Sequence, residues 1–210
     1  EVVIHGDIYD DAYQKALEIS KEEQREFIHP FDDYDVICGQ GTIALEILDE
    51  LPDVDEILVP IGGGGLISGI ALAVKAIKPS VRVIGVEPEG AMTMKHALNE
   101  GGVRPLQRVM TSAEGVAVRQ AGQLTYEICK EYLDGIITVS EQEIMEAVLM
   151  LIEKHKLVAE TAGVLSLAAL KKLTATNRKI VSLISGGNID VVTVSSMINK
   201  GLISRGRIFC

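Results

Sequence analysis

The sequence contains no tryptophan, and aromatic residues make up only 4% of it, so its core must be built from aliphatic side chains. Cysteine is also scarce. The three cysteines, Cys38, Cys129 and Cys210, are far apart and show no CxxC or Cys/His spacing. The sequence therefore indicates neither a zinc site nor a disulfide framework, and free thiols are typical of a reducing compartment such as the cytoplasm.

Long apolar runs are missing as well. No stretch reaches the roughly 20 residues needed to span a bilayer, and the opening residues EVVIHG show no basic region followed by an apolar one, as a signal peptide would. Basic residues number 20 against 30 acidic ones, which gives a net charge of -10. A binding face for nucleic acid or an anionic membrane would be basic. We therefore expect a cytoplasmic protein that binds neither.

Helical and strand-like patterns alternate along the chain. Continuous Val/Ile strands between helices favour an α/β fold: a mostly parallel sheet with helices on both faces. The predicted strands are residues 2–4, a start near 27–28, 55–62, 81–88, 134–140 and 179–185. The predicted helices are residues 9–24, 39–51, 65–77, 92–99, 120–132, 140–156, 160–173 and 191–202.

Four consecutive glycines, Gly62, Gly63, Gly64 and Gly65, stand between the strand at 55–62 and the helix that follows. Glycines allow backbone N–H groups to converge without Cβ obstruction, and a helix N-terminus adds positive potential, so the motif predicts an anion site, most often for phosphate. It is neither a Walker A loop nor a strict GxGxxG fingerprint. A tight strand-to-helix junction without a ligand is the alternative.

Three further motifs carry polar or small residues where the chain turns. LISGGN places Ser185 and Gly186 after a buried strand, SAEGVAV contains Gly115, and AETAGVLSLAAL contains Glu160. Each has a simpler interpretation. Ser185 and Gly186 suit an ordinary turn, and Glu160 suits an acid placed in a first helical turn by the helix dipole.

In this order and spacing, the four motifs resemble those of the fold-type-II pyridoxal-phosphate enzymes, which share the tryptophan synthase β-like fold. The threonine dehydratase (threonine ammonia-lyase) and serine racemase group is the most similar. The resemblance covers nearly the whole chain. The segments that carry it are CGQGTIALEIL, VPIGGGGLISGIALAVKAIKPSVRVIGVEPEGA, SAEGVAV, ETAGVLSLAAL and LISGGNID.

The resemblance implies a role for each motif. The four glycines and the N–H of Leu66 would hold the 5′-phosphate of pyridoxal phosphate. Ser185, followed by Gly186, would hydrogen-bond the pyridine nitrogen and leave the ring largely unprotonated, which suits elimination. Gly115 would line the substrate side of the ring, and Glu160 would lie near the cofactor.

The same resemblance implies a cation site near the end of VIGVEP. Glu87 and the carbonyl of Ala91 match its ligands, whereas Thr93 stands where an acid is expected. That departure argues against a divalent ion and leaves a monovalent one open.

The Schiff-base lysine of the group, in a Ser-x-Lys-x-Arg setting, and its Ser-x-Gly-Asn-His loop have no counterpart here, so the sequence offers no catalytic residue of its own. In the group both come before the segment to which this chain corresponds. We therefore expect a fragment that is inactive alone. Residues 1–30 would be a remnant of a small cofactor domain, 31–203 the large domain, and 204–210 the start of a linker to a regulatory ACT domain.

For the parent protein the resemblance implies deamination of L-threonine, and less readily of L-serine, by a homodimer or homotetramer in isoleucine biosynthesis or threonine catabolism. Two alternatives stay open. One is a serine racemase or serine dehydratase of the same fold. The other is a non-catalytic ligand-binding α/β module.

Overall fold

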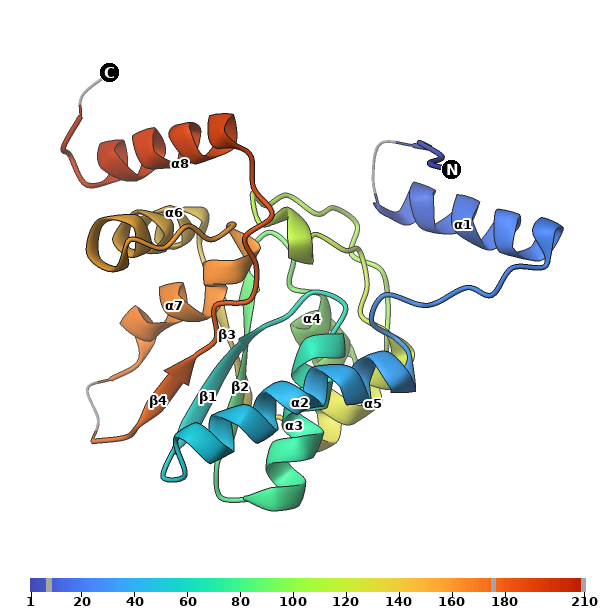
Figure 1. The fold of residues 1–210 in the computed structure, drawn as a ribbon, viewed down its shortest axis with the longest axis horizontal. Helices are drawn as coiled ribbons and strands as arrows, with labels where there is room; N and C mark the ends of the chain where they lie inside the picture. The colour runs from blue at the N-terminus through green and yellow to red at the C-terminus, as the bar shows by residue number, and fades with distance from the viewer. Residues whose placement is uncertain (7–8, 175–176, 209–210) are drawn as a thin grey trace.

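The computed structural model describes residues 1–6, 9–174 and 177–208 and contains one four-stranded parallel sheet (Figure 1). The strand order is β3-β2-β1-β4. The strands are β1 (Glu56–Pro60), β2 (Arg82–Pro88), β3 (Gly135–Val139) and β4 (Ile180–Ser182). All five residues of β1 are buried, as the unbroken apolar run of a strand covered on both faces requires.

Helices cover both faces of this sheet. One apolar cluster joins the sheet to α2, α3, α4 and α5, and a second joins it to α6, α7 and α8. The predicted α/β class, with helices on both faces of a parallel sheet, is therefore confirmed. The helices are α1 (Tyr9–Glu23), α2 (Tyr34–Glu50), α3 (Gly65–Ile77), α4 (Thr93–Glu100), α5 (Gln123–Tyr132), α6 (Glu141–Met150), α7 (Leu165–Ala169) and α8 (Val191–Ser204).

The chain order of the strands creates a switch point beside β1. From β1 the chain moves outward through β2 to β3, and it then returns to place β4 on the other side of β1. In open parallel sheets, ligands bind where the strand order reverses, at the carboxyl ends of the strands. The loops after β1 and β4 lie at that edge.

Three of the predicted elements are wrong. The strand expected to start near Phe27 and Ile28 does not form, and these residues lie in irregular structure between α1 and α2. Val2 and Ile4 form no strand and are about nine-tenths exposed, at 89% and 92%, because no described strand lies beside them to take up their backbone hydrogen bonds. The single helix predicted over 160–173 is instead a 3-10 turn, Ala162–Val164, followed by the short helix α7 and a second 3-10 turn, Leu170–Lys172. Figure 1 shows α1 standing apart from the sheet, and the predicted domain limits stay predictions.

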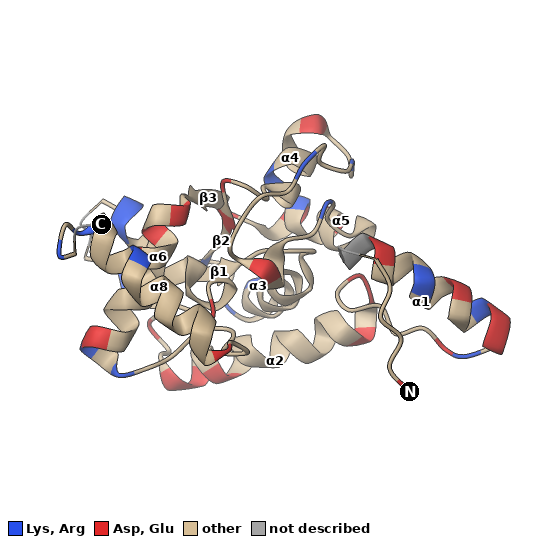
Figure 2. Ribbon diagram, turned by 90° about the horizontal axis from the view of Figure 1, so that it is seen from above, with Lys and Arg blue, Asp and Glu red and all other residues tan. Residues whose placement is uncertain are grey.

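Charge is distributed unevenly over the helices. Acidic and basic residues alternate along α1, whereas α2 carries acids at both ends and no Lys or Arg (Figure 2). None of the helices that the structure describes combines the length and apolar character needed to cross a membrane.

Candidate cofactor site

The glycine loop is tightly enclosed. Gly64 caps α3 with φ +102°, a left-handed conformation that favours glycine. A Cβ on Gly63 would lie 2.4 Å from ring atoms of Phe31, and a Cβ on Gly65 would lie 2.9 Å from the Phe31 backbone. Side chains are therefore excluded from this loop by conformation at one position and by close approach at two others.

The carbonyl groups of the loop are bonded to the protein behind it. The Gly62 carbonyl accepts a hydrogen bond from Thr93 Oγ1 at 3.1 Å. The Gly63 carbonyl accepts from Thr125 Oγ1 at 2.6 Å and from the N–H of Gly122 at 3.0 Å. In a trans peptide the N–H points opposite to the carbonyl, so the N–H groups that follow point away from these donors.

The N–H groups from Gly62 to Leu66 have no acceptor among the described residues. They precede and open α3, a helix of 13 residues, whose N-terminal end adds positive potential. Converging free N–H groups at a helix N-terminus form an anion site. This favours the phosphate interpretation of the four glycines over a junction without a ligand.

A cavity of about 620 Å³ opens in front of the loop, at the switch point between β1 and β4. Segments far apart in the sequence line it. All the predicted cofactor residues except Gly186 are among its lining residues. The main ones are Pro30, Phe31, Gln40, Gly62, Gly63, Gly64, Gly65, Leu66, Glu114, Gly115, Glu160, Ala162 and Ser185.

The remaining predicted residues are packed around Glu160. Its N–H donates to the Gly186 carbonyl at 3.1 Å, and a Cβ on Gly186 would lie 2.1 Å from Glu160 Oε1. A Cβ on Gly115 would lie 3.3 Å from the same oxygen. A side chain at 186 would collide with this carboxylate and one at 115 would be tight against it, so three separate motifs meet at the cavity wall.

The cavity fits pyridoxal phosphate in three respects. The glycine loop offers N–H groups to a phosphate, the volume accommodates one aromatic ring with its substituents, and Ser185 offers a neutral hydroxyl from the loop after β4. The N–H of Ser185 donates to the Gly163 carbonyl at 3.3 Å, which fixes this loop against the turn after Glu160.

Sequence reasoning missed the residues that support the loop from behind. Phe31 and Asp32 lie between the predicted elements, and Thr125 lies within the helix predicted over 120–132 without any mark of its own. Thr125 is completely buried. No local pattern marks these residues, because their roles arise from contacts with the glycine loop, which lies 32 to 62 residues away in the chain.

Glu87, near the end of β2, is completely buried, and its carboxylate lies against the first turn of α4. Its carboxylate accepts hydrogen bonds from the N–H groups of Met94 at 2.7 Å and Lys95 at 3.0 Å. Burial raises the pKa of Glu87 to about 7, against the opposing effect of these donors. Within the described residues no group of three His, Cys, Asp or Glu side chains could hold a metal ion. The cation role of Glu87 and the Ala91 carbonyl stays a prediction.

A parallel α/β sheet with a glycine-rich anion loop and a cavity at its switch point defines a domain that binds a phosphorylated cofactor. Comparison with known families identifies the cofactor. Residues 1–186 match the family described as "Pyridoxal-phosphate dependent enzyme", and the chain belongs to that family. The predicted fold type and cofactor are thereby confirmed.

Two curated relatives are named for their action on L-threonine. The chain is 47% identical over 208 residues to the L-threonine ammonia-lyase of Thermotoga maritima, covering 99% of this chain and 52% of that protein. It is 50% identical over 201 residues to the catabolic L-threonine dehydratase of Escherichia coli K12, covering 94% and 61%. It thus spans little more than half the length of these relatives.

Two solved structures have the same fold as this chain. Threonine deaminase isoform 2 of Solanum lycopersicum superposes with a TM-score of 0.88 at 38% identity, over 95% of this chain and 59% of that one. Maize serine racemase superposes with a TM-score of 0.85 at 33% identity, over 98% and 64%. The fold is thus shared with both enzyme types between which the motifs left the choice open.

Proposed function

We propose that this chain forms the cofactor-binding part of a lyase that deaminates L-threonine to 2-oxobutanoate and ammonia, and L-serine to pyruvate and ammonia. The observation that carries the proposal is the cavity at the switch point, where the glycine loop, Gly115, Glu160 and Ser185 meet. The high identity to threonine ammonia-lyases supports the choice of substrate.

Each part of the cavity has a task in this proposal. The N–H groups of the four glycines and Leu66 hold the cofactor phosphate. The Ser185 hydroxyl hydrogen-bonds the pyridine nitrogen and, being neutral, leaves that nitrogen without a proton. Bound pyridoxal phosphate supplies an electron-withdrawing ring that stabilises negative charge at the substrate Cα. Gly115 leaves room for the substrate. Glu160 positions the loop that carries Ser185, because its N–H donates to the carbonyl of the neighbouring Gly186.

No lysine lines the described part of the cavity. We therefore propose that residues 1–210 alone bind phosphate without turning threonine over, and that turnover needs the protein with whatever flanking sequence its gene encodes. We propose that this protein is cytoplasmic and acts as a homodimer or homotetramer. Sedimentation of the purified protein tests the proposed oligomeric state.

The test is to express the protein with its flanking sequence, add pyridoxal phosphate, and follow 2-oxobutanoate from L-threonine and pyruvate from L-serine. Formation of D-serine from L-serine in the same sample is the signature of the racemase alternative, which the maize structure favours. Absence of both keto acids with the cofactor bound contradicts the proposal. Failure to bind pyridoxal phosphate at all favours the non-catalytic module.

The variant Ser185→Ala removes the proposed ring partner without touching the phosphate loop. We expect cofactor binding to persist while threonine turnover falls at least tenfold. The variant Asn188→Ala is the matched control, because Asn188 is exposed and does not line the cavity. Equal turnover in the two variants would remove Ser185 from the proposed site.

A further inference from the structure

A short turn, residues 29–32, is organised around one imidazole nitrogen. His29 Nδ1 accepts a hydrogen bond from the N–H of Asp32 at 2.8 Å and from the N–H of Phe31 at 3.3 Å. A nitrogen that accepts a hydrogen bond must keep its lone pair, so Nδ1 is unprotonated in this structure. The same imidazole lies edge-on to the Phe31 ring, with centroids 4.6 Å apart.

This 29–32 turn reaches the glycine loop by two routes. The first is direct, because the Phe31 ring occupies the space that a side chain on Gly63 would fill. The second runs through α5. The Asp32 carboxylate accepts from the N–H of Gln123 at 2.9 Å and of Thr125 at 3.1 Å, and the Thr125 hydroxyl holds the Gly63 carbonyl at 2.6 Å.

His29 is half-buried among aromatic rings, and its burial favours the neutral form. Its ring also lies edge-on to Tyr13 and Phe27, and it lines a cavity of about 390 Å³ together with Arg119. Burial lowers the pKa of His29 below its ordinary value, against the raising effect of the Asp32 and Asp33 carboxylates. The folded state thus prefers the neutral imidazole that the two hydrogen bonds require.

We propose that His29 is a positioning residue for phosphate binding: its unprotonated Nδ1 holds Phe31 and Asp32 against the glycine loop, and acid weakens phosphate binding by removing that acceptor. Protonation of Nδ1 abolishes both hydrogen bonds to the turn and frees it from the loop. The proposal deepens the proposed function but needs only phosphate binding, not turnover, to be tested.

The chain offers a matched pair of variants. In His29→Asn the side-chain oxygen takes over the acceptor role for N–H groups two and three residues on, as in an Asx turn, and does not titrate. In His29→Leu the bulk remains and the acceptor is lost. The dissociation constants of pyridoxal phosphate and of inorganic phosphate are measured for all three proteins between pH 5.5 and 8.5.

The phosphate group itself titrates near pH 6, so the informative quantity is the ratio of variant to wild-type affinity at each pH. We expect His29→Asn to match the wild type at pH 8 and to bind several-fold more tightly than it at pH 5.5, because the lowered pKa of His29 leaves part of the wild-type imidazole neutral at that pH. We expect His29→Leu to bind about tenfold more weakly than the wild type at pH 8 and to differ less from it at pH 5.5.

If the phosphate affinity of His29→Asn relative to the wild type stays constant across this pH range, the proposal is wrong. It is also wrong if His29→Leu binds phosphate as tightly as the wild type at pH 8. If His29→Leu does not fold, the ratio for His29→Asn decides alone. The outcome is separate from that of the proposed function. A wild-type protein that shows the expected phosphate ratios but no threonine deamination contradicts the deaminase assignment and leaves the role of His29 standing.

Discussion

Gly41 of α2 and Gly69 of α3 face each other where these two helices cross. A Cβ on Gly69 would lie 2.2 Å from the Ile37 carbonyl oxygen and 2.6 Å from the Gly41 nitrogen, and a Cβ on Gly41 would lie 3.0 Å from the Gly69 carbonyl oxygen. The helix that follows the glycine loop is thus packed backbone to backbone against α2. This contact fixes the direction from which α3 presents its N-terminus to the cavity.

Gly69→Ala tests this contact. The added methyl meets backbone atoms that cannot rotate away, so we expect a loss of about 2–3 kcal/mol in the free energy of unfolding. Gly39→Ala is the control within α2, since a Cβ there meets nothing within 4 Å. In a helix interior, Ala at position 39 should add about 0.5–1 kcal/mol. Urea unfolding of both variants measures the difference, and equal stability would contradict the close crossing.

The α/β class was predictable because its signals are local. The apolar run of β1, the helical periodicity after it and the glycines between them all lie within the segment from 55 to 77. The Ser140–Glu143 capping box is local in the same way, because its four-residue pattern stands directly before the helix predicted over 140–156. Each of these features is encoded within a few turns of the chain.

The parts that sequence reasoning missed depend on contacts between distant segments. Nothing around Phe31 indicates that its ring will lie against Gly63, and nothing around Thr125 indicates that its hydroxyl will bind a loop carbonyl 62 residues away. The strand predicted at Val2–Ile4 failed for the converse reason. Its apolar residues suit a strand, but a strand also needs a neighbour, which the sequence alone does not identify.

Thr125→Val removes the buried hydroxyl that holds the Gly63 carbonyl. Valine keeps the shape of the side chain, so the expected cost is that of one lost buried hydrogen bond, about 1–2 kcal/mol in the free energy of unfolding. Phosphate affinity should also fall, because the N–H of Gly64 is oriented by the same peptide. Thr125→Ser keeps the hydroxyl and should retain the affinity. A titration with inorganic phosphate that finds both variants equal would show that Thr125 does not orient the loop.

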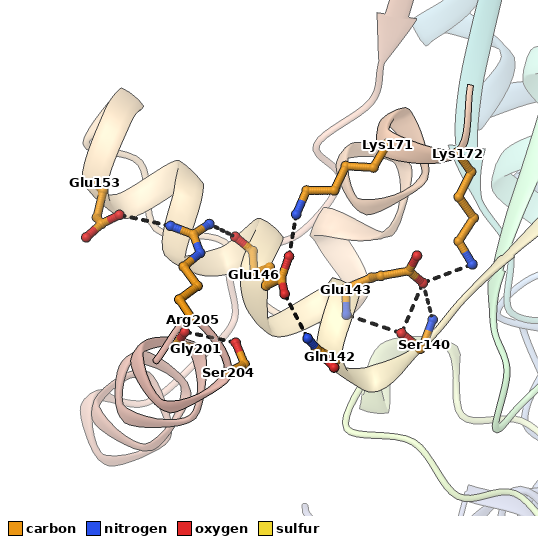
Figure 3. A network of polar contacts seen from close by, with 10 residues as sticks. All are labelled: Ser140, Gln142, Glu143, Glu146, Glu153, Lys171, Lys172, Gly201, Ser204 and Arg205. Carbon is orange, nitrogen blue, oxygen red and sulfur yellow. Dashed lines mark hydrogen bonds and ion pairs between the residues drawn. The ribbon is translucent and has the colours of Figure 1, made fainter. Parts of the chain in front are cut away.

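Ser140→Ala tests the start of α6. The Ser140 hydroxyl accepts from the Glu143 N–H at 3.3 Å, and Glu143 Oε2 accepts from the Ser140 N–H at 2.7 Å (Figure 3). Loss of the cap should lower the free energy of unfolding by about 1 kcal/mol. Ser140→Thr preserves the capping oxygen and should unfold within about 0.5 kcal/mol of the wild type. Thermal unfolding of the pair gives the comparison. If the alanine variant were as stable as the threonine variant, the box would contribute nothing.

The far end of α6 is joined to α8 by ion pairs rather than by a cap. Arg205 Nη1 lies 3.2 Å from Glu153 Oε2, and Arg205 Nη2 donates to the Glu146 carbonyl at 2.9 Å (Figure 3). Arg207 pairs with the same Glu153 carboxylate. These groups are partly exposed, so solvent and salt screen both pairs and each contributes little to stability. The packing of Gly201 against Leu149 and the Met145 carbonyl holds the two helices together more firmly.

The two described cysteines should differ sharply in reactivity. Cys38 is exposed on α2, whereas Cys129 is buried on α5 with its Sγ 3.6 Å from Ser68 Oγ. Burial raises the pKa of the Cys129 thiol to about 12, against the lowering effect of Ser68. The thiolate is the reactive species, so Cys129 is unreactive while it stays buried. Cys210 lies outside the described residues and is removed by Cys210→Ser.

In the Cys210→Ser protein we therefore expect iodoacetamide to modify one thiol per chain in the folded state and two in urea, as counted by intact mass. Peptide mapping should place the first label on Cys38. Because Cys129 becomes accessible only when α5 separates from α3, its labelling rate under native conditions measures the opening of that interface. Gly69→Ala forces α3 away from α2, whereas Ser68→Val acts at the α3–α5 contact itself. We therefore expect the labelling rate of Cys129 to change less in Gly69→Ala than in Ser68→Val. Rapid labelling of Cys129 in the unmodified fold would mean that α5 does not cover it, and the support of the glycine loop by Thr125 on the same helix would then fail as well.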